Sequence, residues 1–160
     1  DGIGGELKEQ TARLGLQANI SFMGPRDDIA AILAASDIGI LCSHEEGFSN
    51  AILEGMASGL PMIVTDVGGN AEAVVDGQTG LVVPAGDIRS LSGAILQLAD
   101  DPALRVRLGA NGRQRAIENF GMQKFVQNHH RLYQKLLEGK SAHDVEGVGV
   151  SPTARAKIQA

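Results

Sequence analysis

Extended and helical hydrophobic patterns alternate along the chain up to Asp87. Apolar runs at residues 37–42 (DIGILC) and 61–65 (PMIVT) are continuous, which is typical of parallel strands covered on both faces. Shorter strands are expected at residues 19–24 (NISFMG) and 81–83. Strands that alternate with helices over short connections predict an α/β fold with a doubly wound, Rossmann-like parallel sheet.

Capping residues and 3.6-residue periodicity place the helices between and after these strands. Asp27 or Asp28 is expected to cap a helix that runs to about residue 35, and Ser49 one that ends near Ser58. The other expected helices span residues 5–16, 71–75, 88–99, 102–119 and 122–138.

The length of 160 residues suits one domain or part of a larger one. Because the chain opens on DGIGG without an initiator Met, we expect it to be cut from a longer protein just after a strand. We assign residues 1–138 to a partial nucleotide-sugar-binding domain with C-terminal helices. Residues 139–160 are polar and aperiodic, and we interpret them as a flexible tail without function.

Charge and cysteine content narrow the functional classes. The net charge of −5 and the lack of a Lys/Arg cluster argue against nucleic-acid binding. Cys42 is the only cysteine, so an intramolecular disulfide is excluded, and we expect this residue to be buried at the end of its strand. With no signal peptide and no apolar run of about 20 residues, the sequence predicts a cytoplasmic protein.

The segment EGFSNAILE carries the candidate chemistry. A helix that begins near Ser49 presents free N–H groups from Asn50 and Ala51, and its dipole favours an anion there. Gly47 allows a close backbone approach, so this helix start is a candidate phosphate site. Carboxyl ends of parallel strands bind ligands, and we therefore expect EEGFSN and DVGGN to face one crevice.

Two carboxylates flank this helix start. Glu54 lies within the helix and could accept two hydrogen bonds from a ribose diol, whereas Glu46 lies in the preceding loop and could hold hydroxyls beyond the phosphate. The alternative is that both are solvated surface charges, since acidic residues are common near helix starts. Spacing alone leaves both interpretations open.

Four ordered motifs carry a family resemblance. They are the E-x7-E spacing of Glu46 and Glu54, then G-L-P, then D-V-G-G-x-x-E, and finally D-G-x-T-G-L-V-V-P. From about Asp1 to Tyr133 the chain resembles the retaining GT-B glycosyltransferases of family four (glycosyl transferases group 1). The matching part is the C-terminal, donor-binding domain without its first strands.

The resemblance implies roles for individual residues. Glu46 would be the catalytic candidate that contacts the hydroxyls of the donor sugar, and Glu54 would bind the ribose. The donor sugar and diphosphate would be held by Glu46, Gly47, Phe48, Ser49, Asn50 and Ala51. A weaker correspondence places Met23, Gly24 and Arg26 at the nucleobase.

The resemblance also implies that no metal or cofactor is used, because the nucleotide sugar is a substrate and GT-B enzymes use protein cations and helix dipoles in place of a divalent ion. His129 and His130 lack partners at metal-ligand spacing and are interpreted as residues of a helix face. Glu72 matches a recurrent family Glu, and a role as partner of a local backbone amide is an equal alternative.

The implied reaction is transfer of a hexose from a UDP- or GDP-sugar to an acceptor hydroxyl on a sugar or lipid-linked molecule, in polysaccharide or glycolipid biosynthesis. Membrane association at the inner face would come through a missing N-terminal domain. The family's Arg and Lys that neutralise the diphosphate would lie upstream of Asp1, so the chain alone is expected to be inactive. A nucleotide-sugar-binding module without transfer activity is the alternative, and the E-x7-E segment disfavours a sugar epimerase.

The resemblance further predicts that two missing strands belong between the NISFMG strand and the DIGILC strand. The chain would then close the gap, borrow strands from another copy or fold loosely.

Overall fold

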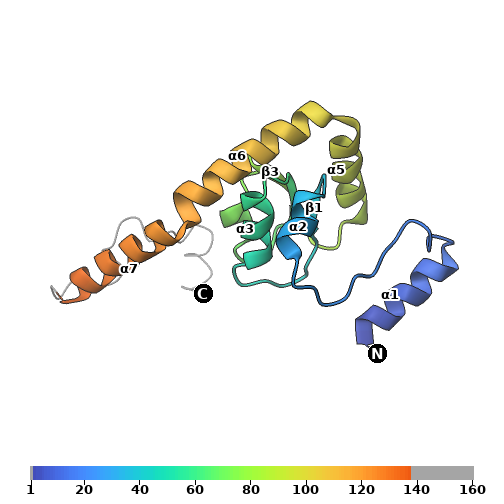
Figure 1. The fold of residues 1–160 in the computed structure, drawn as a ribbon, viewed down its shortest axis with the longest axis horizontal. Helices are drawn as coiled ribbons and strands as arrows, with labels where there is room; N and C mark the ends of the chain where they lie inside the picture. Colours follow the sequence, from blue (N-terminus) through green and yellow to red (C-terminus); the bar gives the residue numbers. More distant parts are fainter. Residues whose placement is uncertain (1, 138–160) are drawn as a thin grey trace.

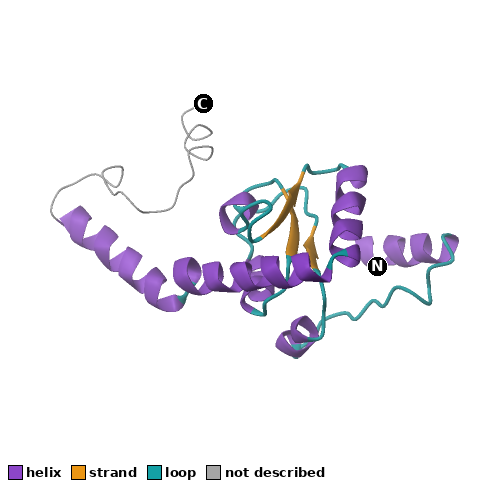
Figure 2. Cartoon of the chain, turned by 90° about the horizontal axis from the view of Figure 1, so that it is seen from above, coloured by secondary structure: helices purple, strands orange, loops and turns teal. Residues whose placement is uncertain are grey.

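The computed structural model describes residues 2–137, which contain one three-stranded sheet. Its strands are β1 (Gly39–Leu41), β2 (Met62–Thr65) and β3 (Gly80–Val83). All pairings are parallel in the order β1-β2-β3, and Figure 2 shows the strands at the centre with helices around them. The predicted parallel α/β architecture is confirmed.

Strand β2 is the centre of the core, because all four of its residues are buried. Alternating side chains point to opposite faces. On one face, Met62 and Val64 join Ile52 and Met56 of α3 (Asn50–Ala57) and Ala73 of α4 (Asn70–Ala73).

On the other face, Ile63 and Val83 pack with Ala94 and Leu98 of α5 (Ile88–Asp100). Leu98 is completely buried, so this helix forms the second layer over β2 and β3. The apolar stripe expected for residues 88–99 is confirmed.

Helix α6 (Pro102–Phe120) contributes to both core faces. Leu108 belongs to the α5 side and Ala116 to the α3 side, and Figure 1 shows this long helix running across the sheet. A Cβ at Gly109 would overlap the carbonyl oxygen of Gly59, so only glycine permits this close approach of α6 to the end of α3.

Two arginines of α6 bind the C-terminal ends of the helices that follow β1 and β2. Arg113 Nη1 donates to the Ala57 carbonyl of α3 at 2.9 Å. Arg115 donates from Nε to Ala73 O and from Nη2 to Glu72 O of α4, both at 2.8 Å. Cationic donors at the last carbonyls of a helix satisfy unpaired acceptors and complement the helix dipole.

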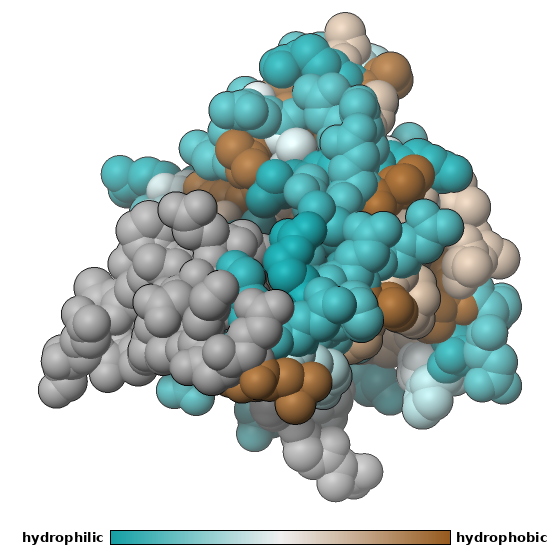
Figure 3. Space-filling model, turned by 90° about the vertical axis from the view of Figure 1, so that its left-hand side faces the viewer, coloured by the Kyte–Doolittle hydropathy of each residue, from teal (hydrophilic) through white to brown (hydrophobic). Residues whose placement is uncertain are grey.

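Helix α7 (Met122–Leu137) extends away from the sheet after a break at Gly121, as Figure 1 shows. None of its side chains is buried within the described part of the chain. Its exposed large hydrophobic residues are Met122, Phe125, Val126, Tyr133, Leu136 and Leu137. Figure 3 looks toward this end of the molecule and shows brown hydrophobic patches separated by hydrophilic side chains.

The N-terminal segment differs from the prediction. Helices α1 (Gly2–Arg13) and α2 (Ile29–Ala34) are present, but residues 19–24 form an irregular connection and no strand. Ile20, Phe22 and Met23 are exposed there, and the segment pairs with no strand of the described sheet. A strand needs a neighbouring strand for its backbone hydrogen bonds, so the apolar pattern of residues 19–24 was not enough to form one.

Strand β1 is less covered than its apolar run suggested. Ile40 pairs with Ile63 on the α5 side, yet its side chain is 44% exposed because α5 covers β2 and β3. Cys42 follows the last residue of β1 and is exposed, so the prediction of a buried cysteine was wrong.

The described residues 2–137 include all of the helices predicted for the domain, apart from the last predicted helical residue, Glu138. The tail predicted at residues 139–160 lies outside the described residues. No helix among residues 2–137 combines the length and apolar character required to cross a bilayer.

Candidate functional site

Two loops meet at the carboxyl edge of the sheet. The β1–α3 loop (residues 42–49) and the β2–α4 loop (residues 66–69) both leave the ends of parallel strands. The Gly69 N–H donates to the Gly47 carbonyl at 2.6 Å, and a Cβ at Gly68 would overlap the Glu46 carbonyl oxygen. The expectation that EEGFSN and DVGGN lie together is confirmed.

The last residue of β2 is hydrogen-bonded to the β1–α3 loop. Thr65 Oγ1 donates to the Ser43 carbonyl at 2.7 Å, and Asn70 Nδ2 donates to the Thr65 carbonyl at 3.1 Å. Thr65 and Asn70 are both buried, and Asn70 Oδ1 has no hydrogen-bond partner among the described residues. This buried polar chain fixes where the loop starts.

The Glu46 carboxylate is fixed within its own loop. Ser43 Oγ donates to Glu46 Oε1 at 2.8 Å, and both side chains are partly buried. A held carboxylate at a strand end is pre-oriented to accept hydrogen bonds from a ligand, with less rotamer freedom to lose than a fully solvated glutamate.

The start of α3 presents free backbone donors. Ser49 is the extended N-cap residue, with φ −86° and ψ 119°, and its side chain makes no capping hydrogen bond. Among residues 2–137, no acceptor is found for the N–H groups of Ser49, Asn50 and Ala51. Unpaired N–H groups and the positive end of the helix dipole together favour an anion at this point.

Glu54 lies one turn after Asn50 on the same face of α3. Its side chain is exposed and makes no hydrogen bond to any other described residue. In the structure, the carboxylate before the helix start, Glu46, is partly buried, and the one within the helix, Glu54, is exposed.

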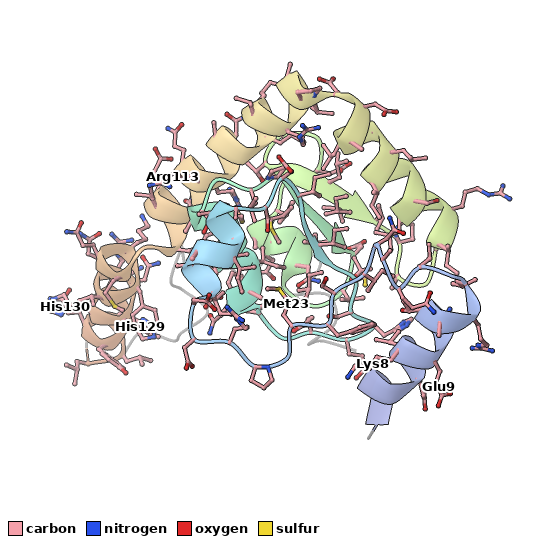
Figure 4. The ribbon with its side chains drawn as sticks, turned by 45° about the vertical axis from the view of Figure 1, so that its right-hand side comes forward. Lys8, Glu9, Met23, Arg113, His129 and His130 are labelled. Atoms are coloured by element: carbon pink, nitrogen blue, oxygen red, sulfur yellow. The ribbon has the colours of Figure 1, made fainter. Side chains whose placement is uncertain are left out.

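The nucleobase candidates lie on a different segment. Met23, 52% exposed, and Gly24, with φ +63°, belong to the irregular connection between α1 and α2, where Figure 4 labels Met23. Arg26 Nε donates to Asp28 Oδ1 at 2.7 Å and Nη2 to Oδ2 at 2.6 Å. The Arg26 hydrogen bonds lower the pKa of Asp28. In the part that the structure describes, no hydrogen bond joins this segment to the β1–α3 loop.

Three contributors to the site were not identified from the sequence. Ser43 orients Glu46, and its position three residues before the glutamate was the available signal. Phe120 contacts Phe48 with ring centroids 5.3 Å apart, and the Arg115 guanidinium lies 5.7 Å from the Phe120 centroid. Phe120 and Arg115 belong to α6, some 70 positions after Phe48 in the chain. No local sequence pattern indicates a contact over such a separation.

Metal-ligating clusters are not seen in residues 2–137: no group of three or more His, Cys, Asp or Glu side chains converges there. His129 and His130 are exposed on α7, which Figure 4 shows away from the sheet, and they are face residues as predicted. The side chain of Glu72 is partly buried, and its backbone carbonyl accepts a hydrogen bond from Arg115.

Comparisons with known proteins identify the family of this chain. The family model described as glycosyl transferases group 1 matches residues 2–101. The N-acetyl-alpha-D-glucosaminyl L-malate synthase of Bacillus anthracis is 34% identical over 124 residues, covering 78% of this chain and 32% of the relative. The lipopolysaccharide core biosynthesis mannosyltransferase LpsB of Rhizobium meliloti is 34% identical over 134 residues, covering 82% of this chain and 38% of the relative.

A solved structure shows the same similarity. The Anabaena protein HepE in complex with UDP-glucose superposes with a TM-score of 0.76 at 28% identity, covering 81% of this chain and 36% of that one. This chain therefore spans about a third of the length of these three proteins. It belongs to the glycosyl transferases group 1 family of GT-B glycosyltransferases and corresponds to part of their Rossmann-like C-terminal domain.

Proposed function

We propose that this chain is the donor-binding part of a retaining glycosyltransferase that transfers a hexose from a nucleotide-diphosphate sugar to an acceptor hydroxyl. The observation that carries the proposal is the start of α3, where unpaired N–H groups follow a held Glu46 and precede an exposed Glu54 in the chain. An anion-binding site with a carboxylate before it and another after it suits a ligand that has hydroxyl groups on both sides of a diphosphate.

Each group has a distinct task in this proposal. The diphosphate accepts hydrogen bonds from the N–H groups of Ser49, Asn50 and Ala51. Glu46, with the backbone of Gly47 and Phe48, contacts the hydroxyls of the donor sugar.

On the other side of the diphosphate, Glu54 accepts hydrogen bonds from the ribose diol. Met23, Gly24 and Arg26 line the position of the nucleobase. Arg26 is paired with Asp28 in the structure. Contact with a nucleobase therefore requires that this ion pair either orients the guanidinium toward the base or opens.

Transfer breaks the bond between the sugar's anomeric carbon and the diphosphate oxygen and forms a bond from that carbon to the acceptor's hydroxyl oxygen, which loses its proton. Negative charge therefore grows on the leaving nucleoside diphosphate. The free N–H groups and dipole of α3 stabilise that charge without a metal or cofactor. Further cations expected from upstream sequence would add to this stabilisation, and we propose that the chain alone is inactive for that reason.

The names of similar proteins guide the choice of substrates. HepE was solved with UDP-glucose, which supports a UDP-sugar as the first donor to test and GDP-sugars as the second. LpsB is named for lipopolysaccharide core biosynthesis, which supports a polysaccharide or glycolipid acceptor. We place the reaction in the cytoplasm, with the acceptor held by other parts of a longer protein at the inner face of a membrane.

The test is calorimetric titration of the chain with UDP, GDP and ADP, after cooperative unfolding has been verified. Selective binding of UDP or GDP supports the proposal and identifies the donor base. Equal binding of all three, or binding of none by a well-folded sample, contradicts a selective donor site in this chain. Transfer by the longer protein then separates an enzyme from a binding module.

A further inference from the structure

The side chain of Phe48 lies close to two other elements of the chain. One is the β2–α4 loop at Gly69, where an added Cβ would lie 2.8 Å from Phe48 Cδ2. The other is α6 at Phe120, with ring centroids 5.3 Å apart and the ring planes tilted by 43°. Tilted aromatic pairs at this distance are attractive and directional.

Phe120 is itself held by two neighbours. The guanidinium of Arg115 lies over its ring, 5.7 Å from the centroid, while donating two hydrogen bonds to the C-terminal carbonyls of α4. Since those bonds fix the guanidinium, the cation–π contact gives Phe120 a defined position.

The break between α6 and α7 constrains Phe120 further. Phe120 is the last residue of α6, and Gly121 follows with an extended backbone, φ −64° and ψ 153°. A Cβ at Gly121 would lie 2.7 Å from the Ile117 carbonyl oxygen, a distance that the backbone would have to relieve by shifting. The close approach of Gly121 to Ile117 therefore favours glycine directly after Phe120.

We propose that Phe120, held by Arg115, is a positioning residue for the β1–α3 loop and keeps the backbone of Gly47, Phe48 and Ser49 in its ligand-binding conformation. The loop contacts the β2–α4 loop through the bond from Gly69 N–H to Gly47 O. Phe120 supplies a second contact through Phe48, so the loop is tied to both the β2–α4 loop and α6. The effect on ligand binding rests on the proposed function, whereas the effect on loop motion does not.

The experiment compares Phe120→Ala with Val106→Ala, because Val106 is an apolar residue of the same helix with its side chain largely exposed. The ¹⁵N relaxation order parameters of Gly47, Phe48 and Ser49 report the mobility of the loop. We expect them to fall from about 0.85, typical of rigid backbone, to below about 0.6 in Phe120→Ala and to stay unchanged in Val106→Ala. The order parameter of Ile63 in β2 should stay high in both variants.

Two further variants separate positioning from general packing. Phe120→Tyr keeps an aromatic ring and should restore the rigid loop, whereas Phe120→Leu keeps apolar bulk without the ring and should leave the loop mobile. If Phe120→Ala does not fold, the Phe120→Leu and Phe120→Tyr pair still decides the question. Unchanged loop order parameters in folded Phe120→Ala or Phe120→Leu, or a fall that includes Ile63 equally, would overturn the proposal.

Titration with UDP-glucose adds a second readout. With a mobile loop, affinity for UDP-glucose should fall about tenfold or more in Phe120→Ala, with recovery in Phe120→Tyr and no change in Val106→Ala. A wild-type chain that binds neither UDP-glucose nor a GDP-sugar would count against the proposed function, while the relaxation data would still test the positioning role. If the wild-type chain binds UDP-glucose and Phe120→Ala binds it with the same affinity, the positioning role is overturned and the proposed function is not.

Discussion

The backbone N–H of Gly69 donates a 2.6 Å hydrogen bond to the carbonyl of Gly47, which joins the loops that follow β1 and β2. Next to it, Gly68 lies so close to the Glu46 carbonyl that no side chain fits between them. The two glycines of DVGGN therefore serve a backbone-to-backbone contact that determines the position of the β1–α3 loop. Their role is in placing the site, in addition to forming a turn.

Gly68→Ala should destabilise the chain more than Gly77→Ala. Both positions have positive φ, at +52° and +68°, so each substitution carries a strain of about 1–2 kcal/mol. Only at Gly68 would the new methyl group meet backbone, and relieving that overlap should add about 1–3 kcal/mol. The free energy of unfolding from urea titration measures the difference, and equal losses for the two variants would contradict the close contact.

Glu54→Ala should weaken binding of UDP and UDP-glucose to the same extent. The lost hydrogen bonds to a charged group are worth about 1.5–3 kcal/mol, which corresponds to about tenfold or more in affinity. Glu45→Ala is the matched control, since Glu45 is an exposed carboxylate in the β1–α3 loop without an assigned role. Unchanged UDP affinity in Glu54→Ala would remove the ribose role.

Glu46→Ala should weaken UDP-glucose binding while leaving UDP binding nearly intact, because its proposed contact is with the sugar. Ser43→Ala should produce a smaller loss of the same kind, since it removes the 2.8 Å hydrogen bond that orients the carboxylate. Calorimetry with both ligands measures the split. Similar losses for UDP and UDP-glucose in Glu46→Ala would place the residue elsewhere in the site.

Leu98→Ala should lower the free energy of unfolding by about 2–5 kcal/mol, because Leu98 is fully buried between α5 and the sheet and its truncation leaves a cavity. Leu96→Ala, two residues away on the exposed side of α5, should change it by less than about 0.5 kcal/mol. Chemical denaturation of both variants checks the orientation of the helix. Comparable losses would mean that α5 packs through another face.

Stability should fall in acid through the N-cap of α5. The Ser90 hydroxyl and backbone N–H groups of Ser90 and Arg89 donate to Asp87, which lowers the pKa of its carboxyl. The folded pKa lies below the unfolded one, so this contribution is complete above about pH 4 and is lost as pH falls through the folded pKa.

The Asp87 contribution can be isolated by comparing unfolding of the wild type and Asp87→Asn between pH 6 and about pH 3. The advantage of the wild type should shrink toward low pH. Ser90→Ala removes the largest cause of the shift, so it should weaken this pH dependence. A stability difference between wild type and Asp87→Asn that stays constant with pH would contradict the role of the ionised cap.

The sequence by itself determined the local elements and the order of the site motifs. Helices α3, α5, α6 and α7 and strands β1–β3 follow from caps, periodicity and apolar runs, and they lie where these signals put them. The Ser49 helix start and the carboxylates Glu46 and Glu54 could be named because capping and spacing are properties of neighbouring residues. The DVGGN segment could be assigned to the same sheet edge because parallel strands end together.

Tertiary structure decided what depends on a distant partner. Residues 19–24 have a strand-like pattern but no neighbouring strand in the described residues, and Ile40 stays exposed because α5 covers β2 and β3. The contact of Phe120 with Phe48 joins residues far apart in sequence, and so does the contact of Gly69 with Gly47. Burial and hydrogen bonding across such separations are set by how helices and strands pack in space, which the local sequence pattern does not encode.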